Sequence, residues 1–298
     1  MGIAFLLLAG LLWSTGGAGI KTLSGFSPLA VSGGRSAISA VFFFILLKGR
    51  VMPPRGSGVW PWAGAAAYCA CVSLYVASIG FTTAANAIIL QYTSLIWIAV
   101  LGWLVLGERP RASELLAVAL GVAGVLLCMG ESLSLFAANG SWGTKLIGDT
   151  MALASGLGYA LVTLFLREMA LGPARESAPV ISLFHGNLLA SVIGLPLLIR
   201  SAGQVGMPGH DPALAWLVLI WLGVGQLAGG YWCYQRGLRT TRALTASLIT
   251  LIEPVLNPLW VALFVGEMPS RGTAVGGVFV LASVVLSLVG RQQANGSG

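Results

Sequence analysis

The chain has 298 residues, of which 57% are hydrophobic and 8% are charged, and its mean hydropathy is +0.89. Soluble domains carry roughly 25% charged residues, so this composition excludes a water-soluble globular protein and predicts a chain that lies in lipid. The formal net charge of +7 does not predict nucleic-acid binding, because nearly all Lys and Arg residues lie in short loops between apolar runs.

Ten apolar segments follow one another along the chain, each close to the roughly 20 residues that a membrane-spanning helix needs. The predicted spans are residues 3–20, 28–47, 59–80, 84–106, 112–129, 148–166, 178–199, 213–235, 242–265 and 272–290. Ser27 followed by Pro28 is typical of a helix start. The connections are short, so we expect an all-α polytopic membrane protein without a soluble domain.

The basic residues predict the orientation of these spans, because cytoplasmic loops carry an excess of Lys and Arg. With the N terminus inside, the inner segments hold Lys48, Arg50, Arg55, Arg109, Arg111, Arg167, Arg175, Arg236, Arg239, Arg242 and Arg291. The outer loops hold only Lys21, Lys145, Arg200 and Arg271. We therefore expect a multi-pass protein of the bacterial inner membrane with both termini in the cytoplasm.

Two similar corners indicate an internal repeat. Leu106-Gly107-Glu108-Arg109-Pro110 ends the fourth span, and Val265-Gly266-Glu267-Met268-Pro269 ends the ninth. Glu267 lies 267 − 108 = 159 residues after Glu108. A unit of five spans crosses the membrane an odd number of times, so its two copies must be inverted, which is a recurrent plan of transporters.

The same register pairs other residues. A shift of 159 places Tyr75 against Tyr234, and a shift of 146 places Trp13 against Tyr159 and Lys21 against Arg167. We expect two inverted five-helix repeats at 1–130 and 148–291. A connecting loop at 131–147 lies outside, and a disordered tail covers 292–298.

Ten spans in two halves, with a Gly-Glu-x-Pro corner after the fourth span of each, resemble the EamA-type branch of the drug/metabolite transporter superfamily. Trp13 and Lys21 in the first span, Arg35 in the second and Pro254 in the ninth also fit that pattern, while the first half has Leu95 where the second has Pro254. Within the superfamily the chain is similar to bacterial aromatic amino-acid exporters. The resemblance implies a site surrounded by spans 1–4 and 6–9, with spans 5 and 10 at the periphery.

The sequence offers no set of catalytic residues. It contains no HExxH, GxSxG or nucleotide-binding glycine motif, and no two carboxylates share one span. The four Cys residues lie inside apolar runs without metal-ligand spacing. We therefore expect no enzyme, no metal site and no cofactor.

Two charged residues inside the spans are candidates for substrate binding. Arg35 lies seven residues into the second span, where a guanidinium is costly unless it meets water, a carboxylate or backbone carbonyls. It could bind a substrate carboxylate or have a structural or interfacial role. Glu253 precedes Pro254, which predicts a kinked, partly hydrated ninth span. Glu253 could take up a proton, bind an ammonium group or pair with Arg35, and Asn257 lies one turn further on the same face.

Many aromatic residues lie deeper than the interfacial belts in which Trp and Tyr usually gather. We expect roughly half of these deeper rings to line a central cavity between the repeats. The predicted substrate-binding residues are Trp13, Arg35, Tyr75, Gln91, Tyr92, Trp97, Tyr159, His185, Tyr234, Glu253 and Asn257.

A cavity rich in Tyr and Trp, with one acid and one base, suits an amphipathic zwitterion. The sequence therefore predicts a secondary transporter that exports aromatic or apolar amino acids by alternating access. A multidrug or quaternary-cation exporter, and a sugar-phosphate or nucleotide-sugar exchanger, are the alternatives. The expected partners are the bilayer and a small-molecule substrate; proton coupling, facilitated diffusion, and a monomer or a homodimer stay open.

Overall fold

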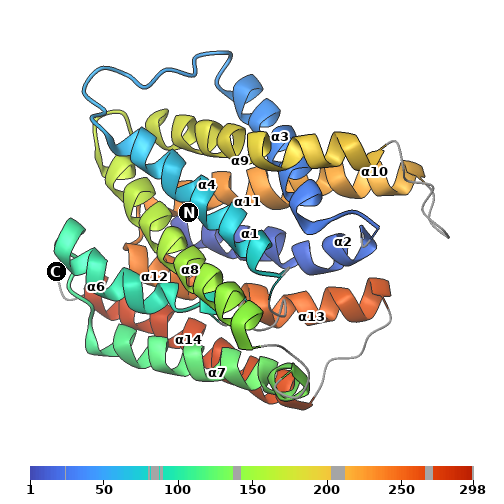
Figure 1. Ribbon diagram of the computed structural model, residues 1–298. Helices are drawn as coiled ribbons and strands as arrows, with labels where there is room; N and C mark the ends of the chain where they lie inside the picture. The colour runs from blue at the N-terminus through green and yellow to red at the C-terminus, as the bar shows by residue number, and fades with distance from the viewer. Residues whose placement is uncertain are drawn as a thin grey trace.

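The structure is a computed structural model that describes residues 1–23, 25–79, 81, 87, 90–136, 142–202, 212–265 and 271–296. Every regular element formed by these residues is a helix (Figure 1). A helix pairs its own backbone N–H and C=O groups, which is the requirement for a segment surrounded by lipid. The all-helical class predicted from composition is confirmed.

The helices follow the predicted spans in chain order. Those before residue 137 are α1 (Gly2–Ser14), α2 (Gly16–Thr22), α3 (Pro28–Leu46), α4 (Trp60–Ile79), α6 (Ser94–Leu106) and α7 (Ala112–Phe136). Those after residue 141 are α8 (Trp142–Leu171), α9 (Ala178–Ala202), α10 (Pro212–Trp221), the π-helix η1 (Leu222–Gly229), α11 (Gly230–Leu238), α12 (Ala243–Thr250), α13 (Ile252–Val265) and α14 (Arg271–Gly296). Pro28 begins α3, and the Ala30 N–H donates to the Ser27 side chain at 3.3 Å, as the Ser-Pro pair predicts.

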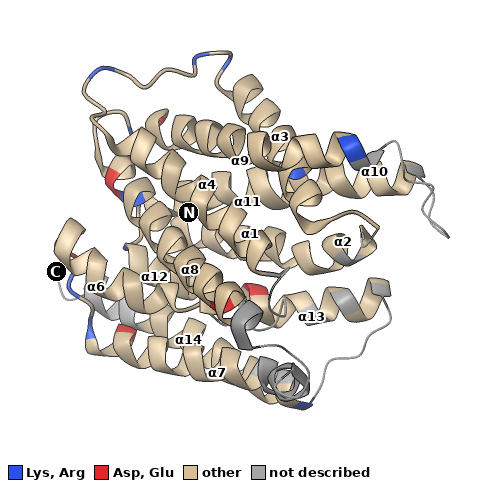
Figure 2. Cartoon of the chain, in the orientation of Figure 1, with Lys and Arg blue, Asp and Glu red and all other residues tan. Residues whose placement is uncertain are grey.

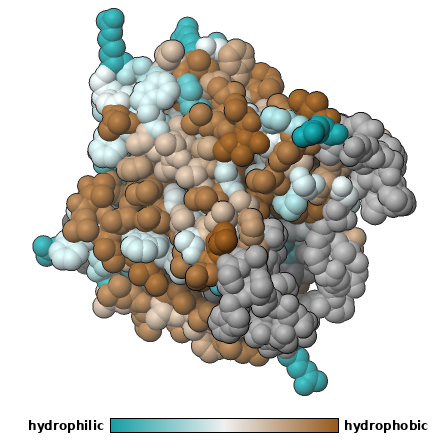
Figure 3. Space-filling view, in the orientation of Figure 1, coloured by the Kyte–Doolittle hydropathy of each residue, from teal (hydrophilic) through white to brown (hydrophobic). Residues whose placement is uncertain are grey.

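Six helical stretches within the described residues are long and apolar enough to cross a membrane. They are Gly2–Ile20, Pro28–Leu46, Leu146–Leu171, Ala178–Arg200, Ala213–Leu238 and Ala243–Phe264. α4 and three shorter apolar helices, Ser94–Leu106, Ala112–Leu127 and Ala274–Val289, lie at the other four predicted spans. Large apolar side chains such as Leu263 and Val192 face outward, and apolar residues dominate the face in Figure 3. This exterior suits lipid.

Several spans are interrupted near their middles. α1 and α2 are separated at Thr15, and α12 and α13 at Leu251, two residues before Glu253. The ninth span is thus interrupted at Leu251, three residues before the predicted kink at Pro254. Pro254 lies in the first turn of α13, where its missing N–H has no intrahelical partner to lose. A turn at Tyr92–Thr93 precedes α6, although the residue equivalent to Pro254 is Leu95 there. Tyr92 lies 159 residues before Leu251, so the two breaks occur at positions that the sequence repeat makes equivalent.

Helix pairs far apart in sequence pack along one another. α3 lies along α9, α7 along α14, α4 along α8 and α9, and α1 along α11. The backbones of α3 and α9 come closest at two glycines, where a Cβ on Gly33 would lie 2.2 Å from the carbonyl carbon of Gly194. Side chains larger than hydrogen at this crossing would force the two helices apart.

The corner that ends α6 ties four helices together at the charged end of the bundle (Figure 2). Gly107 ends α6 in the left-handed conformation with φ = 68°. The Glu108 carboxylate accepts from the Arg167 Nε at 2.9 Å and from the Ala243 backbone N–H at 2.9 Å, so it caps α12. Arg242 pairs with Glu114 at 2.9 Å. The contacts of Glu108 therefore give this corner a structural role.

Some predicted boundaries are corrected or fall outside the described residues. α7 and α8 extend into the predicted 131–147 loop, leaving only residues 137–141 between them, outside the described residues. α14 continues to Gly296, so residues 292–296, predicted as a disordered tail, are helical. Residues 266–270, which include the Glu267 corner, also lie outside the described part of the chain.

Replacing Glu108 by Gln should lower the melting temperature of the detergent-solubilised protein by several degrees. The substitution removes the charge that Arg167 faces and weakens the cap of α12, and breaking a buried pair costs roughly 3–5 kcal/mol, less where the pair is partly exposed as here. The exposed Glu176 provides the control, because Glu176→Gln should leave the melting temperature unchanged. An equal effect of both substitutions would refute the structural role.

Replacing Gly33 by Ala should also destabilise the protein, because its methyl group would clash with the Gly194 backbone. Gly102 is the matched control: an added Cβ there meets only the Leu164 side chain at 3.6 Å. Gly102→Ala should leave the melting temperature unchanged or raise it, since Ala favours a helix by about 1 kcal/mol over Gly. A stable Gly33→Ala variant with wild-type melting would contradict the close crossing of α3 and α9.

Candidate functional site

Five aromatic rings meet between α1, α4, α8 and α11. Trp13 contacts Tyr231 and Tyr234 with ring centroids 4.9 and 5.2 Å apart, and it approaches Tyr159 at 6.3 Å. Tyr231 also contacts Tyr68 at 4.8 Å. We call these five residues the aromatic cluster. Trp13, Tyr159 and Tyr234, which the sequence singled out on separate spans, are thus brought together.

Two members of the cluster are fixed by hydrogen bonds to neighbouring helices. The fully buried Tyr234 hydroxyl lies 3.0 Å from the Thr163 hydroxyl and 2.8 Å from that of Ser247. The Tyr68 hydroxyl donates to Asn187 Oδ1 at 3.1 Å. A buried phenol held in this way keeps one orientation. Tyr68 and Tyr234 therefore form a rigid frame for the other rings.

Arg35 projects from α3 beside this cluster and is 6% exposed. Its one hydrogen bond to the described residues runs from Nη1 to Gln226 Oε1 on η1, at 3.5 Å, and its buried Nε has no partner. No carboxylate of the described residues forms an ion pair with it. Arg35 interacts electrostatically with Tyr68, Tyr75 and Tyr231. The guanidinium is therefore a buried charge whose hydrogen-bonding capacity is largely unused.

Glu253 lies in the first turn of α13, where the positive end of the helix dipole favours a carboxylate. It is half-buried and makes no hydrogen bond or ion pair with the described residues. It interacts electrostatically with Tyr75, Tyr159 and Tyr231. One turn further, the buried Oδ1 of Asn257 lacks a partner and lies against the backbone at Gly17.

The two charges do not pair with each other, so the hypothesis of an Arg35–Glu253 ion pair is wrong for this conformation. Both interact with Tyr75 and Tyr231. Tyrosines of α4 and α11 thus interact electrostatically with both an uncompensated cation and an uncompensated carboxylate. Such a site can hold a molecule that carries both charges on an apolar body. Within the described residues, no three His, Cys, Asp or Glu side chains gather as a metal site would require.

Four other predicted residues lie apart from this arrangement. Gln91 donates to Ser155 Oγ at 3.0 Å and ties the start of the fourth span to α8, while Tyr92 packs beside a separate apolar core. Trp97 is 41% exposed on the outer surface of α6. His185 packs against the exposed Trp62, with ring centroids 4.7 Å apart. We therefore leave these four residues out of the candidate site.

The structure adds Tyr68, Tyr231 and Gln226 to the site. Tyr231 lies three residues before Tyr234 and thus on the same helical face, so this spacing could have placed Tyr231 among the predicted substrate-binding residues. Gln226 is a polar residue within an apolar span, and a polar side chain in that setting is by itself a sign of a functional position. No local pattern in the sequence indicates that Gln226 meets Arg35, because the two residues are 191 positions apart.

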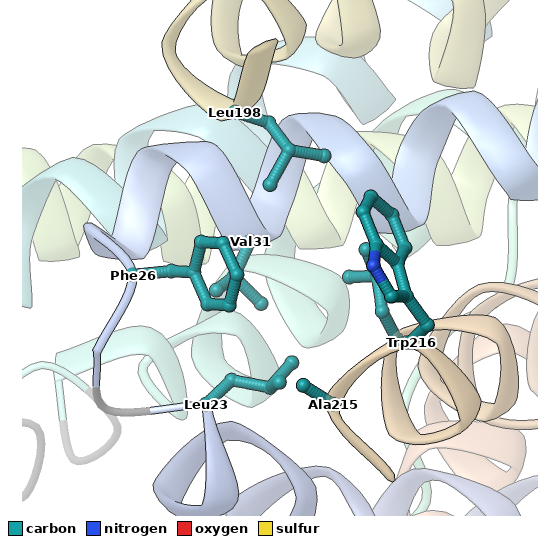
Figure 4. Close-up of a pocket in the computed structure, with 7 residues that line it drawn as sticks. Leu23, Phe26, Val31, Leu198, Ala215 and Trp216 are labelled. Carbon is teal, nitrogen blue, oxygen red and sulfur yellow. The ribbon is translucent and has the colours of Figure 1, made fainter. Parts of the chain in front are cut away.

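A separate apolar recess lies between the ends of α3, α9 and α10 (Figure 4). It is lined by Leu23, Phe26, Val31, Leu198, Ala215, Trp216 and Leu219. Ligand sites combine an apolar lining with a few polar groups that orient the ligand. This lining offers no charged side chain, so we do not assign the substrate to it.

Known transporters match the chain over nearly its whole length. The model of the EamA-like transporter family covers residues 1–130 and 146–289. The uncharacterized transporter YwfM of Bacillus subtilis is 27% identical over 305 residues, which cover 97% of this chain and 94% of YwfM. An uncharacterized transporter of Clostridium kluyveri is 25% identical over 224 residues, or 75% of this chain and 70% of that one. A crystal structure with 17% identity has a TM-score of 0.77 over 98% of both chains, which shows the same fold.

The two tyrosines equivalent by sequence should respond differently to loss of their hydroxyl groups. Tyr234→Phe leaves the buried Thr163 and Ser247 hydroxyls without their shared partner, which costs about 1–3 kcal/mol, and should lower the melting temperature. The Tyr75 hydroxyl makes no hydrogen bond to the described residues, whereas the backbone carbonyl of Tyr75 accepts one from the Ser78 hydroxyl. Tyr75→Phe should therefore leave the melting temperature unchanged. Equal melting temperatures for the two variants would contradict the framing role of Tyr234.

Proposed function

The chain belongs to the EamA-like transporter family, as its paired corners predict, and we propose that it is a secondary transporter that exports small amphipathic metabolites, most of all aromatic or apolar amino acids. It is a membrane transporter by family, and the relatives from Bacillus subtilis and Clostridium kluyveri are uncharacterized transporters. The substrate class therefore rests on the site itself. The observation that carries it is the pair of uncompensated charges, Arg35 and Glu253, which interact electrostatically with the same two tyrosines, Tyr75 and Tyr231.

We propose ten spans in two inverted five-helix repeats, with the site between them. The packing supports this, because exchanging the halves converts one set of contacts into another. α4 with α8 becomes α11 with α1, α6 with α8 becomes α13 with α1, and α4 with α9 becomes η1 with α3. α3 with α9 and α7 with α14 exchange into themselves. The contact of Trp13 with its counterpart Tyr159 is expected near such an axis.

The proposed setting is the bacterial inner membrane, with both termini in the cytoplasm. The loops predicted as cytoplasmic carry most of the basic residues. Three described ion pairs, all formed by Glu108 or Glu114, lie at this end and link the first half to Arg167 and Arg242 of the second. Rocking of one half against the other would have to break these pairs to open this side.

The site favours a zwitterion over the alternatives. A sugar phosphate would require several cations in the cavity, and Arg167, the counterpart of Lys21 in the second half, is engaged with Glu108 instead. A quaternary ammonium ion is the stronger rival, because Glu253 lies among three tyrosines that could surround a cation. Such a ligand leaves the buried charge of Arg35 without a partner. An amino acid satisfies both charges.

Reconstitution of the purified chain into liposomes tests this proposal. We expect saturable counterflow of labelled phenylalanine and tyrosine, which Arg35→Gln and Glu253→Gln each reduce by about tenfold or more, the effect of roughly 1.4 kcal/mol. The exposed residues Arg55 and Glu176 provide controls, and Arg55→Gln and Glu176→Gln should transport at the wild-type rate. Saturable flux of quaternary cations but not of amino acids would favour the rival. Flux without saturation would indicate a channel, and no flux a non-transporting role.

An imposed pH gradient decides how transport is driven. Glu253 is the candidate carrier of a coupled proton, and the titratable groups that interact electrostatically with it are Tyr75, Tyr159 and Tyr231. With proton coupling, the gradient should accelerate phenylalanine flux in the wild type and have no effect on Glu253→Gln. Equal wild-type flux with and without the gradient would identify facilitated diffusion.

A further inference from the structure

We propose that Arg35 and Gln226 form a carboxylate-binding subsite, and that Gln226 determines whether the transporter prefers substrates with a free carboxylate. Arg35 supplies the charge, and Gln226 is the positioning residue that keeps the guanidinium turned toward the tyrosines without neutralising it. The inference rests on the proposed function and deepens it, because it divides the site into an anionic and a cationic half.

The first argument is the unmatched charge of Arg35. The acid–base pairs of the described residues lie at the corner near Glu108 and Glu114, and each cation there is also bound to backbone carbonyls. Arg35 is more deeply buried and has only one long hydrogen bond, with its Nε unpartnered. A guanidinium presents five N–H donors in a planar fork that fits a carboxylate. An anion supplied by the ligand would complete it.

The second argument is the backbone around Gln226. It lies on η1, an eight-residue π-helical segment, and π-helical turns are frequent at functional sites. Gly223 brings η1 directly against α3, where an added Cβ would lie 3.0 Å from the carbonyl oxygen of Arg35. On the other side, the Gln226 amide nitrogen lies over Gly16, after the break between α1 and α2. Close packing on both sides holds Gln226 Oε1 toward Arg35.

The third argument is the chemistry of the amide. Its oxygen can accept a hydrogen bond from the guanidinium, but the side chain carries no charge, so Arg35 keeps its full attraction for a ligand carboxylate. A glutamate in the same place would pair with Arg35 and compete with the ligand. A carboxylate at Arg35 leaves the substrate body beside Tyr75 and Tyr231, which also interact with Glu253. The substrate amine is thereby directed to Glu253.

The test compares two probes that differ only in the carboxylate, phenylalanine and phenethylamine, in liposomes that contain the full chain. The wild type should prefer phenylalanine. Gln226→Glu should lower the ratio of phenylalanine to phenethylamine flux by about tenfold or more, because the new carboxylate occupies Arg35. Gln235→Glu is the matched control: it adds the same charge at a buried glutamine of α11 whose side chain makes no hydrogen bond to Arg35, and should keep the wild-type ratio. An unchanged ratio in Gln226→Glu would overturn the subsite.

A second variant and a binding assay keep the test decisive. Gln226→Met preserves size but removes the acceptor, so it should lower the same ratio by a smaller factor even where Gln226→Glu folds poorly. In detergent, phenylacetate should raise the melting temperature of the wild type more than benzyl alcohol does, and this difference should vanish in Gln226→Glu. Wild-type protein that transports neither amine nor amino acid but shows this difference would refute the proposed function and retain the subsite. Equal stabilisation by the two compounds would refute the subsite.

Discussion

A polar group inside a bilayer has no water to bind, so it must find its partner in the protein or in a ligand. At the corner after α6 this requirement is met within the chain, since Glu108 and Glu114 bind two arginines, a threonine hydroxyl and the start of α12. Near the middle of the bundle it is not met. Arg35 and Glu253 interact electrostatically with the same tyrosines, and neither has an oppositely charged partner among the described residues. The contrast separates groups that hold the fold from groups left for a ligand.

Interrupted helices supply much of this arrangement. The break at Thr15 lies next to Gly16, and the break at Leu251 lies two residues before Glu253. Gln226 lies within the π-helical segment η1. A broken helix frees backbone groups and helix ends at membrane depth, which is tolerated only where protein or water covers them. Transporters commonly place their substrates at such discontinuous helices. Here the positive end of the α13 helix dipole also favours the negative charge of Glu253.

The tyrosines of the site differ in how well their hydroxyl groups are fixed. The hydroxyls of Tyr234 and Tyr68 are bound to Thr163, Ser247 and Asn187, whereas the Tyr75 hydroxyl makes no hydrogen bond to the described residues. Tyr75 and Tyr234 are equivalent by sequence, yet Tyr234 belongs to the rigid frame and the Tyr75 hydroxyl is available to a ligand. The doubled sequence has therefore produced two chemically distinct surfaces around one centre. An asymmetric substrate with an apolar body requires such a difference.

The sequence by itself determined the lipid setting, the helical class, the order of the spans, the family and the interruption before Pro254, because hydropathy, proline chemistry and the Gly-Glu-x-Pro corners are local and act wherever the chain folds. It also placed Trp13, Arg35, Tyr159 and Glu253 among the candidates. Only the tertiary structure decided that Trp97 faces outward, that His185 packs on Trp62, and that Gln226 meets Arg35. Nearly every span carries apolar residues on all its faces, so the periodicity of the sequence does not reveal which face of a helix is turned inward. That choice depends on the crossing of helices such as α3 and α9 at Gly33 and Gly194, contacts between residues far apart in the chain.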